Sequence, residues 1–185
     1  IDIATTLNPD EIIKRFENSD VKVKETGIEH GTLTLVFEDQ KFEVTTLRQD
    51  VSTDGRHANI EFTENWKEDS ERRDFTINAI YLDQKGKIFD PQLGLKDLKN
   101  NKVQFIGDPD KRIKEDYLRI LRFLRFSIQY QSFDINDQIQ KAIKLNLNGI
   151  TKLSKERIYS ELEKIIKLKN FYDLFKNEFL LDTFK

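Results

Sequence analysis

The spacing of apolar positions changes near residue 110, which predicts a sheet-containing first part and a helical second part. Between Gly31 and Leu47 apolar and polar residues alternate, a pattern typical of two antiparallel strands joined by a turn at 38–40. The apolar face of this hairpin consists of Leu33, Leu35, Phe37, Phe42 and Val44. Glu43 is expected on the opposite face, because strand side chains alternate between faces.

Shorter signals predict the elements around this hairpin. Asn8 and Pro9 stand before periodic apolar positions and predict a helix start, with a strand before it. Residues 48–65 are polar and aperiodic, which predicts a long loop with a turn at 54–57. Residues 66–77 are compatible with a helix and residues 79–82 with a strand.

Leu and Ile recur at three- and four-residue spacings through most of the second part. This predicts helices over 110–130, 137–147 and 154–168. We therefore expect an α+β fold, in which residues 1–109 form a domain with a mainly antiparallel or mixed sheet and residues 110–185 form an all-α domain.

Composition narrows the class of protein. No apolar run among the 185 residues approaches the roughly 18 that a membrane span needs, so no membrane partner is expected. The absence of Cys excludes disulfides, thiolate zinc sites and a cysteine nucleophile, and it permits a reducing compartment such as the cytoplasm, where we expect the protein. The net charge of −2 argues against coating nucleic acid by bulk attraction but leaves room for a local basic stripe.

A stripe of charged residues lies beside an apolar row in the segment 115–128. Asp116, Arg119, Arg122 and Arg125 recur every three residues and would follow one side of an α-helix. One interpretation is an amphipathic helix with an ordinary ion pair worth about 0.3–0.5 kcal/mol. The other is that an Asp acceptor and an Arg donor fork meet the edge of a nucleobase, with the further Arg suited to phosphates. The spacing leaves both open.

Two further segments carry polar groups. Arg72 to Ala79 reads Arg-Arg-Asp-Phe-Thr-Ile-Asn-Ala, which suits either a phosphate and sugar site or a solvated face before a core strand. Asp90 to Leu98 reads Asp-Pro-Gln-Leu-Gly-Leu-Lys-Asp-Leu, a connector that needs no catalytic role.

Together these three segments resemble, in order and approximate spacing, three successive motifs of the class II tRNA nucleotidyltransferases, the family of CCA-adding enzymes and bacterial poly(A) polymerases. The resemblance covers residues 1 to about 169. The runs Thr26 to Thr32, Phe42 to Thr46 and Leu153 to Ile158 with Glu161 resemble other family segments. The resemblance implies a polymerase-β-like nucleotidyltransferase head over 1–109 and an all-α neck over 110–185 that recognises the base.

The chain departs from the family at its start. Members carry a Gly-Gly loop and then an Asp-x-Asp followed by Ala-Thr, whereas Asp2-Ile3-Ala4-Thr5 matches only the second Asp and the segment after it. Members also continue past the neck into body and tail helices that bind the tRNA. We therefore expect a core fragment of a longer protein, whose activity in isolation the sequence leaves open.

The resemblance implies a two-metal phosphoryl transfer. In the family, two Mg²⁺ ions on the paired Asp activate the RNA 3′-hydroxyl and stabilise the leaving pyrophosphate. Asp2 would be a metal ligand, and one Asp alone should bind Mg²⁺ weakly. Glu43 is a candidate third catalytic carboxylate, although an exposed strand Glu with no such role fits the same pattern.

The resemblance also implies the nucleotide contacts. Arg73 and Asp74 would contact sugar and phosphate, and Asn78 would shape that pocket. Asp116 and Arg119 would form pairing-like hydrogen bonds to cytosine or adenine, which are worth roughly 1–3 kcal/mol of discrimination. The remaining two stripe residues, Arg122 and Arg125, would extend that face toward triphosphate or primer.

The expected function is therefore addition of C, C and A from CTP and ATP to the 3′ end of tRNA. Poly(A) synthesis shares the same motifs, and a noncatalytic nucleotide- or RNA-binding fragment is the alternative from another class. The run 54–57 resembles the flexible element that serves the change from C to A addition, which favours the first function. The sequence does not predict an oligomeric state.

Overall fold

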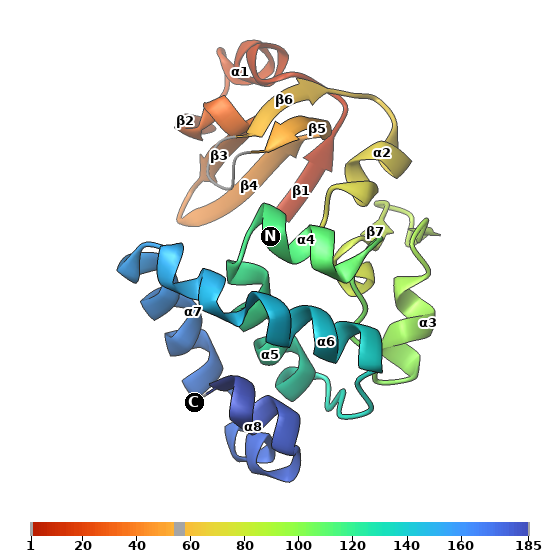
Figure 1. The fold of residues 1–185 in the computed structure, drawn as a ribbon. Coiled ribbons are helices and arrows are strands. Elements are labelled where there is room, and N and C mark those ends of the chain that lie inside the picture. Colours follow the sequence, from red (N-terminus) through yellow and green to blue (C-terminus); the bar gives the residue numbers. More distant parts are fainter. Residues whose placement is uncertain (1, 54–57, 185) are drawn as a thin grey trace. The chain divides into compact units, whose positions relative to one another are not determined.

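The computed structural model describes residues 2–53 and 58–184, which form two compact units (Figure 1). The strand unit comprises the described residues up to 72, and the helical unit comprises those from 73 to 184. Residues 73–109 thus belong by their contacts to the helical unit. The division expected at 109/110 separates a head from a neck by function, and it stays a prediction.

The strand unit is built on a mixed four-stranded sheet in the order β1-β4-β3-β2. Strand β1 is parallel to β4, and the other pairs are antiparallel, which confirms the predicted sheet. The sheet strands are β1 (Asp2–Thr5), β2 (Lys22–Gly27), β3 (Thr32–Phe37) and β4 (Gln40–Thr46), with the short helix η1 (Ile28–His30) between β2 and β3. A small core of Ile12, Leu33, Leu35 and Val44 joins α1 (Pro9–Phe16) to one face of this sheet.

The start of α1 follows from its first residues. The Asn8 side chain accepts a hydrogen bond from the Glu11 backbone N–H at 3.0 Å, and the Glu11 side chain accepts one from the Asn8 N–H at 2.9 Å. This reciprocal capping satisfies two amides that have no partner within the helix. Pro9 occupies the first turn, where its missing N–H costs nothing, so the predicted helix start is confirmed.

The prediction of a long loop over 48–65 was wrong for the segments that flank its centre. Strands β5 (Arg48–Thr53) and β6 (Ala58–Phe62) pair antiparallel and are followed by α2 (Trp66–Glu71). A strand is held by backbone hydrogen bonds, which a polar segment can form without an alternating apolar pattern in its sequence. The predicted turn at 54–57 lies outside the described residues.

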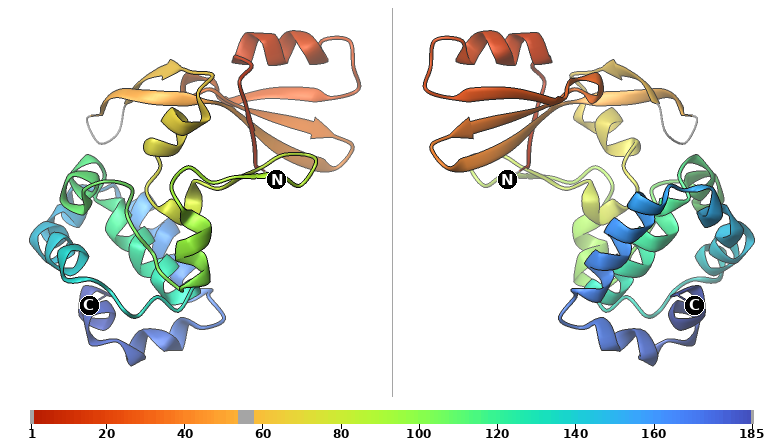
Figure 2. Two further views of the ribbon diagram at one scale, coloured as in Figure 1. Left: turned by 90° about the vertical axis from the view of Figure 1, so that its right-hand side faces the viewer. Right: turned by 90° about the vertical axis from the view of Figure 1, so that its left-hand side faces the viewer.

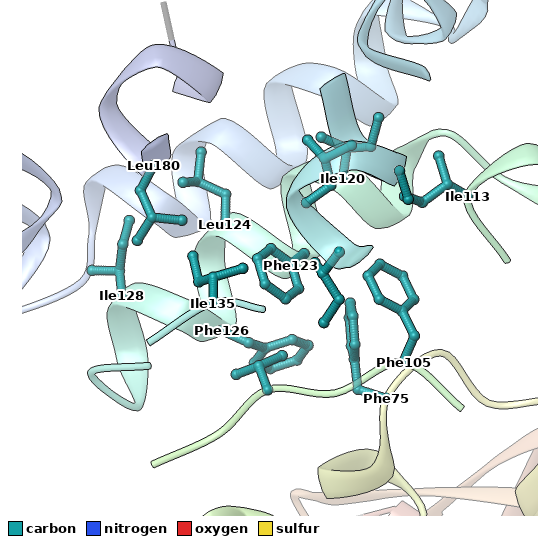
Figure 3. Packing of buried hydrophobic residues seen from close by; sticks show 14 of the residues in the cluster. Phe75, Phe105, Ile113, Ile120, Phe123, Leu124, Phe126, Ile128, Ile135 and Leu180 are labelled. Carbon is teal, nitrogen blue, oxygen red and sulfur yellow. The ribbon is translucent and has the colours of Figure 1, made fainter. Parts of the chain in front are cut away.

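The helical unit is organised around α5 (Leu118–Gln129). Phe123 of α5 stacks on Phe105, with ring centroids 5.7 Å apart, and Phe105 packs against Phe75 at 4.8 Å (Figure 3). Helix α7 (Lys155–Ile166) lies beside α5 (Figure 2). The other elements are η2 (Thr76–Asn78), β7 (Tyr81–Leu82), β8 (Ile88–Phe89), α3 (Gly94–Lys99), α4 (Pro109–Glu115), α6 (Asp137–Asn146), η3 (Leu147–Lys152), η4 (Phe171–Lys176) and α8 (Glu178–Phe184).

Phe75 is completely buried in this core, so the chain on either side of it is fixed in place. Asp74, the residue before it, is held at the edge of the core. None of the helices in the part of the chain that the structure describes has the length and apolar character that a membrane span requires.

Candidate active site

The two predicted catalytic carboxylates are neighbours in the sheet of the strand unit. Asp2 of β1 is the register partner of Glu43 of β4, and both are exposed. Directly paired residues share one face of a sheet, with strands about 4.8 Å apart. Glu43 lies on the face opposite Val44, whose side chain is in the core, as the alternation predicted.

Two exposed carboxylates on one face are hard oxygen ligands of the kind that Mg²⁺ prefers. Within 2–53 and 58–184 no group of three or more His, Cys, Asp and Glu residues is arranged to hold a metal ion. Asp2 and Glu43 therefore supply part, but not all, of the ligand set that a divalent ion needs.

Asp74 and Asn78 come together in the helical unit. The 3₁₀ turn η2 folds the chain back, so that Asn78 Nδ2 donates to Asp74 Oδ1 at 2.9 Å. The Phe75 N–H donates to the same oxygen at 3.0 Å, and Arg122 Nε of α5 donates to the other oxygen, Oδ2, at 2.5 Å. Asp74 is only 8% exposed, so this carboxylate is both buried and fully hydrogen-bonded.

These contacts set the charge of Asp74. Burial raises the pKa of its carboxyl, but the Arg122 guanidinium and the hydrogen bonds from Arg122, Asn78 and the Phe75 N–H lower it further than burial raises it. The pKa therefore lies below its ordinary value of 3.8, and the group is an anion at neutral pH.

The ionised Asp74 should stabilise the helical unit, and acidification should remove this stabilisation. A carboxyl whose folded pKa is depressed stabilises the fold above its unfolded pKa, and this stabilisation is lost as the pH falls through the folded value. We expect the free energy of unfolding of the helical unit to fall with pH from about 4 downward. Urea unfolding at a series of pH values, followed by far-UV circular dichroism, measures this free energy. In Asp74→Asn the free energy of unfolding should depend less on pH below about 4. An equally steep acid profile in Asp74→Asn would contradict this assignment.

The two arginines before Asp74 belong to different units. Arg72 donates to Asp69 Oδ1 at 2.7 Å and to the Arg48 carbonyl at 3.0 Å, both within the strand unit. Asp69 is fully buried, so Arg72 is a structural residue there. Arg73 donates to the Asn78 carbonyl at 3.2 Å and lies 5.2 Å from the Tyr81 ring centroid, beside the predicted pocket.

The connector 90–98 fixes the turn that presents Asp74 and Asn78. Asp97 Oδ2 accepts a hydrogen bond from the Thr76 hydroxyl at 2.7 Å. A Cβ at Gly94 would lie 2.1 Å from the Thr76 carbonyl oxygen, so only glycine allows this approach. Asp90 accepts hydrogen bonds from the backbone N–H groups at the start of α3. In these contacts the connector positions other residues, and a catalytic role for it is not required.

The prediction that Asp116 shares one helix with Arg119 was wrong. Helix α4 ends at Glu115, Asp116 is extended (φ −154°, ψ 107°), and α5 begins at Leu118. Asp116 Oδ1 accepts a hydrogen bond from the Leu118 N–H at 3.1 Å. An Asp side chain that bonds a nearby backbone amide competes with helix continuation, which explains the break.

Asp116 and Arg119 both have intramolecular partners. Asp116 Oδ2 accepts from Arg157 Nη2 of α7 at 2.7 Å, while Arg119 Nη1 donates to Glu115 at 2.6 Å and to the Arg112 carbonyl at 2.7 Å. Their side chains are 24% and 13% exposed, so neither is completely buried. No pattern in the sequence indicated these partners, although Arg157 belongs to one of the family segments.

The two remaining arginines of α5 are also paired. Arg122 binds Asp74, and Arg125 Nε donates to Glu161 of α7, whose side chain is 2% exposed. The guanidinium of Arg125 also lies over the Phe126 ring, 4.0 Å from its centroid. Each arginine predicted on the stripe is thus bound to a carboxylate, two of them from distant parts of the chain.

Comparison with protein families gives two matches along this chain. Residues 1–104 match the poly A polymerase head domain, and residues 132–177 match the probable RNA and SrmB-binding site of polymerase A. The first match covers more than half of the chain.

Individual proteins are similar over nearly the whole chain. The mitochondrial CCA tRNA nucleotidyltransferase 1 of Homo sapiens is 46% identical over 90% of this chain and 39% of its own length. The CCA-adding enzyme of Bacillus licheniformis is 40% identical over 90% of this chain and 41% of its own length. This chain therefore spans about two fifths of the length of these curated relatives.

A solved structure shows the same fold. The crystal structure of the Bacillus stearothermophilus CCA-adding enzyme in complex with CTP superposes with a TM-score of 0.81 at 30% identity. The match covers 96% of this chain and 43% of the other. It extends over both units described above.

Proposed function

Since the chain belongs to the poly A polymerase head-domain family, we propose that it is the core of a template-independent nucleotidyltransferase that adds C, C and A from CTP and ATP to the 3′ end of tRNA. The observation that carries the proposal is the pairing of Asp2 with Glu43 on one exposed face of the sheet. It supplies oxygen ligands for a metal in a chain whose curated relatives are named CCA-adding enzymes. The proposal keeps the division into a head, 1–109, and a base-recognising neck, 110–185.

Asp2 and Glu43 would hold Mg²⁺. The ion, when bound, would lower the pKa of the RNA 3′-hydroxyl and stabilise charge on the departing pyrophosphate. The side chains themselves contribute two anionic groups on adjacent strands, at a fixed spacing set by the sheet.

Asp116 and Arg119 would read the base. Both intramolecular hydrogen bonds of Arg119 use Nη1, so Nε and Nη2 remain available as two donors of the guanidinium fork. Each Asp116 oxygen accepts one hydrogen bond and has a second lone pair. The Watson–Crick edge of cytosine requires one acceptor and two donors, and that of adenine requires one acceptor and one donor, so the same pair of side chains can serve both bases.

The sugar and the phosphates would meet the groups around Asp74. We assign Arg73, Asp74 and Asn78 to that pocket. Arg122 uses Nε for Asp74, so its two terminal nitrogens are available to a phosphate, and its side chain is 32% exposed. Arg125, at 15% exposure, would contribute to the positive potential beside the primer or triphosphate.

Primer extension tests the function. We expect a tRNA that ends before its CCA to gain C, C and then A when CTP and ATP are supplied together, and to gain only C with CTP alone. Extension by ATP alone into a tail of A would favour poly(A) synthesis, which the name of the matching family domain keeps as the second candidate.

Binding by this chain gives a result that does not depend on turnover. CTP and ATP should bind more tightly than UTP and GTP in titration calorimetry. Equal affinity for all four nucleotides, with no extension of tRNA, would overturn the proposal in favour of a noncatalytic fragment.

The compartment and the partners follow from the same proposal. A tRNA-processing enzyme without cysteine suits the cytoplasm, which is our proposal, although the human relative carries a mitochondrial name. The partners would be the tRNA 3′ end, CTP and ATP. Fractionation of cells that produce the tagged full-length protein checks the location.

A further inference from the structure

The sheet of the strand unit has a second, polar face that the proposed chemistry uses only at one end. Val23, Leu33, Leu35 and Val44 point into the core with α1. The residues between them therefore lie on the other face, because strand side chains alternate. The sheet register joins four of these residues in one row: Asp2 of β1, Glu43 of β4, Thr34 of β3 and Lys24 of β2.

Charge changes sign along this row. Asp2 and Glu43 are exposed anions at one end, and Lys24 is an exposed cation at the other. The next row adds two more exposed lysines, since Lys22 and Lys41 are both register partners of Val36. We call Lys22, Lys24 and Lys41 the lysine corner.

Hydroxyl groups cover the sheet beside this row. The Thr34 hydroxyl lies 2.7 Å from that of Thr26, and the Thr32 hydroxyl lies 3.1 Å from that of Thr45. No other charged residue separates Glu43 from Lys24 along the row, because Thr34 is its third member. Glu43 and Lys24 are thus joined by a neutral hydrogen-bonding surface, whereas Lys41 lies two residues before Glu43 on the same face of β4.

The lysine corner differs from four arginines of the helical unit. Arg119, Arg122, Arg125 and Arg157 are each bound to a carboxylate. Among the residues that the structure describes, none of the three lysines has an ion pair. Cations that are exposed, clustered and unpaired can bind an external anion without breaking an ion pair of the fold.

We propose that this polar face is the surface along which the primer RNA strand runs, with its 3′ end at Asp2 and Glu43 and its backbone phosphates on the lysine corner. The inference rests on the proposed function and adds the place of the RNA strand. Lys24 lies three strand spacings from Asp2, about 14 Å. That distance spans about four stacked nucleotides at ~3.4 Å each.

Salt dependence of RNA binding tests this surface. The variant K22Q/K24Q/K41Q should lower the slope of log affinity against log salt by about 2, since each phosphate contact to single-stranded RNA contributes about 0.7. Fluorescence anisotropy of a labelled single-stranded RNA with the 185-residue chain measures it. The matched control is K14Q/R15Q/K67Q, which removes three exposed cations of the same unit from α1 and α2.

RNAs of different length distinguish binding of an RNA strand at the lysine corner from binding of a free triphosphate there. An RNA of about eight nucleotides should lose affinity in the lysine variant, whereas a dinucleotide, which reaches Lys41 but ends before Lys22 and Lys24, should lose much less. Affinity for CTP and ATP should stay unchanged. Loss of nucleotide affinity without loss of RNA affinity would assign the lysines to the triphosphate and overturn the proposal.

Two other results would also overturn it. One is an equal loss of slope in the lysine variant and in its control, and the other is no RNA binding by the unmodified chain at low salt. Failure of the proposed function looks different, because RNA would then bind through the lysine corner while CTP and ATP are neither selected nor added.

Discussion

Replacing Glu161 with alanine is expected to destabilise the helical unit by about 3–5 kcal/mol, because it leaves a nearly buried guanidinium without its anion. Glu161 of α7 is 1% exposed and accepts from Arg125 of α5, which is itself 15% exposed. Lys164 adds a second, more exposed partner at 3.2 Å. The pair links two helices that lie side by side, so its loss should loosen their packing.

The experiment can separate the two units. Trp66 is the only tryptophan and lies in α2, so its fluorescence follows the strand unit, while far-UV circular dichroism is dominated by the helices of the other unit. Urea unfolding of Glu161→Ala should shift the circular dichroism transition and leave the fluorescence transition in place. Glu163→Ala is the matched control, since Glu163 is an exposed residue of the same helix that pairs with Lys167. Similar transitions for both variants would show that the buried pair contributes nothing.

Replacing Arg119 with alanine is expected to reduce the preference for CTP and ATP over UTP and GTP by about 1–3 kcal/mol, roughly fivefold to 150-fold. The fold should survive, because Glu115 keeps Arg112 as a partner at 2.7 Å after the change. Arg119→Lys should lose most of the preference as well, since an ammonium lacks the planar fork that matches two acceptors.

Calorimetric titration of the four nucleotides measures this preference, and thermal unfolding checks the fold. Lys111→Ala is a suitable control, because Lys111 is an exposed residue of α4 close in sequence to the site. An unchanged order of affinities in Arg119→Ala would remove Arg119 from base recognition and leave it as a structural residue of the α4–α5 junction.

The resemblance seen in the sequence is confirmed by the family match, and so is the α+β class of the fold. The hairpin of β3 and β4 was predictable because one of its faces is buried, which forces apolar residues to alternate. The hairpin of β5 and β6 was not, because its polar pattern resembles that of a loop.

The break between α4 and α5 at Asp116 was not predicted from the sequence either, for a different reason. A three-residue period also occurs when an extended residue is followed by a helix, so the spacing of Asp116 and Arg119 did not distinguish the two cases. An Asp two residues before an apolar helical run is itself a signal for a helix start, and it predicts the observed bond to the Leu118 N–H. The partners of the arginines lie up to 48 residues away along the chain, and no local pattern reports them.

The carboxylate that meets each arginine makes these positions interdependent. Asp74 with Arg122, Asp116 with Arg157, and Glu161 with Arg125 each join residues that are distant in the sequence. Loss of either member leaves an isolated charge, so a single replacement is penalised while a joint replacement need not be. Among homologous chains, the two residues of each ion pair should therefore change together. Reversing both charges of one pair should restore much of the stability that either single reversal removes.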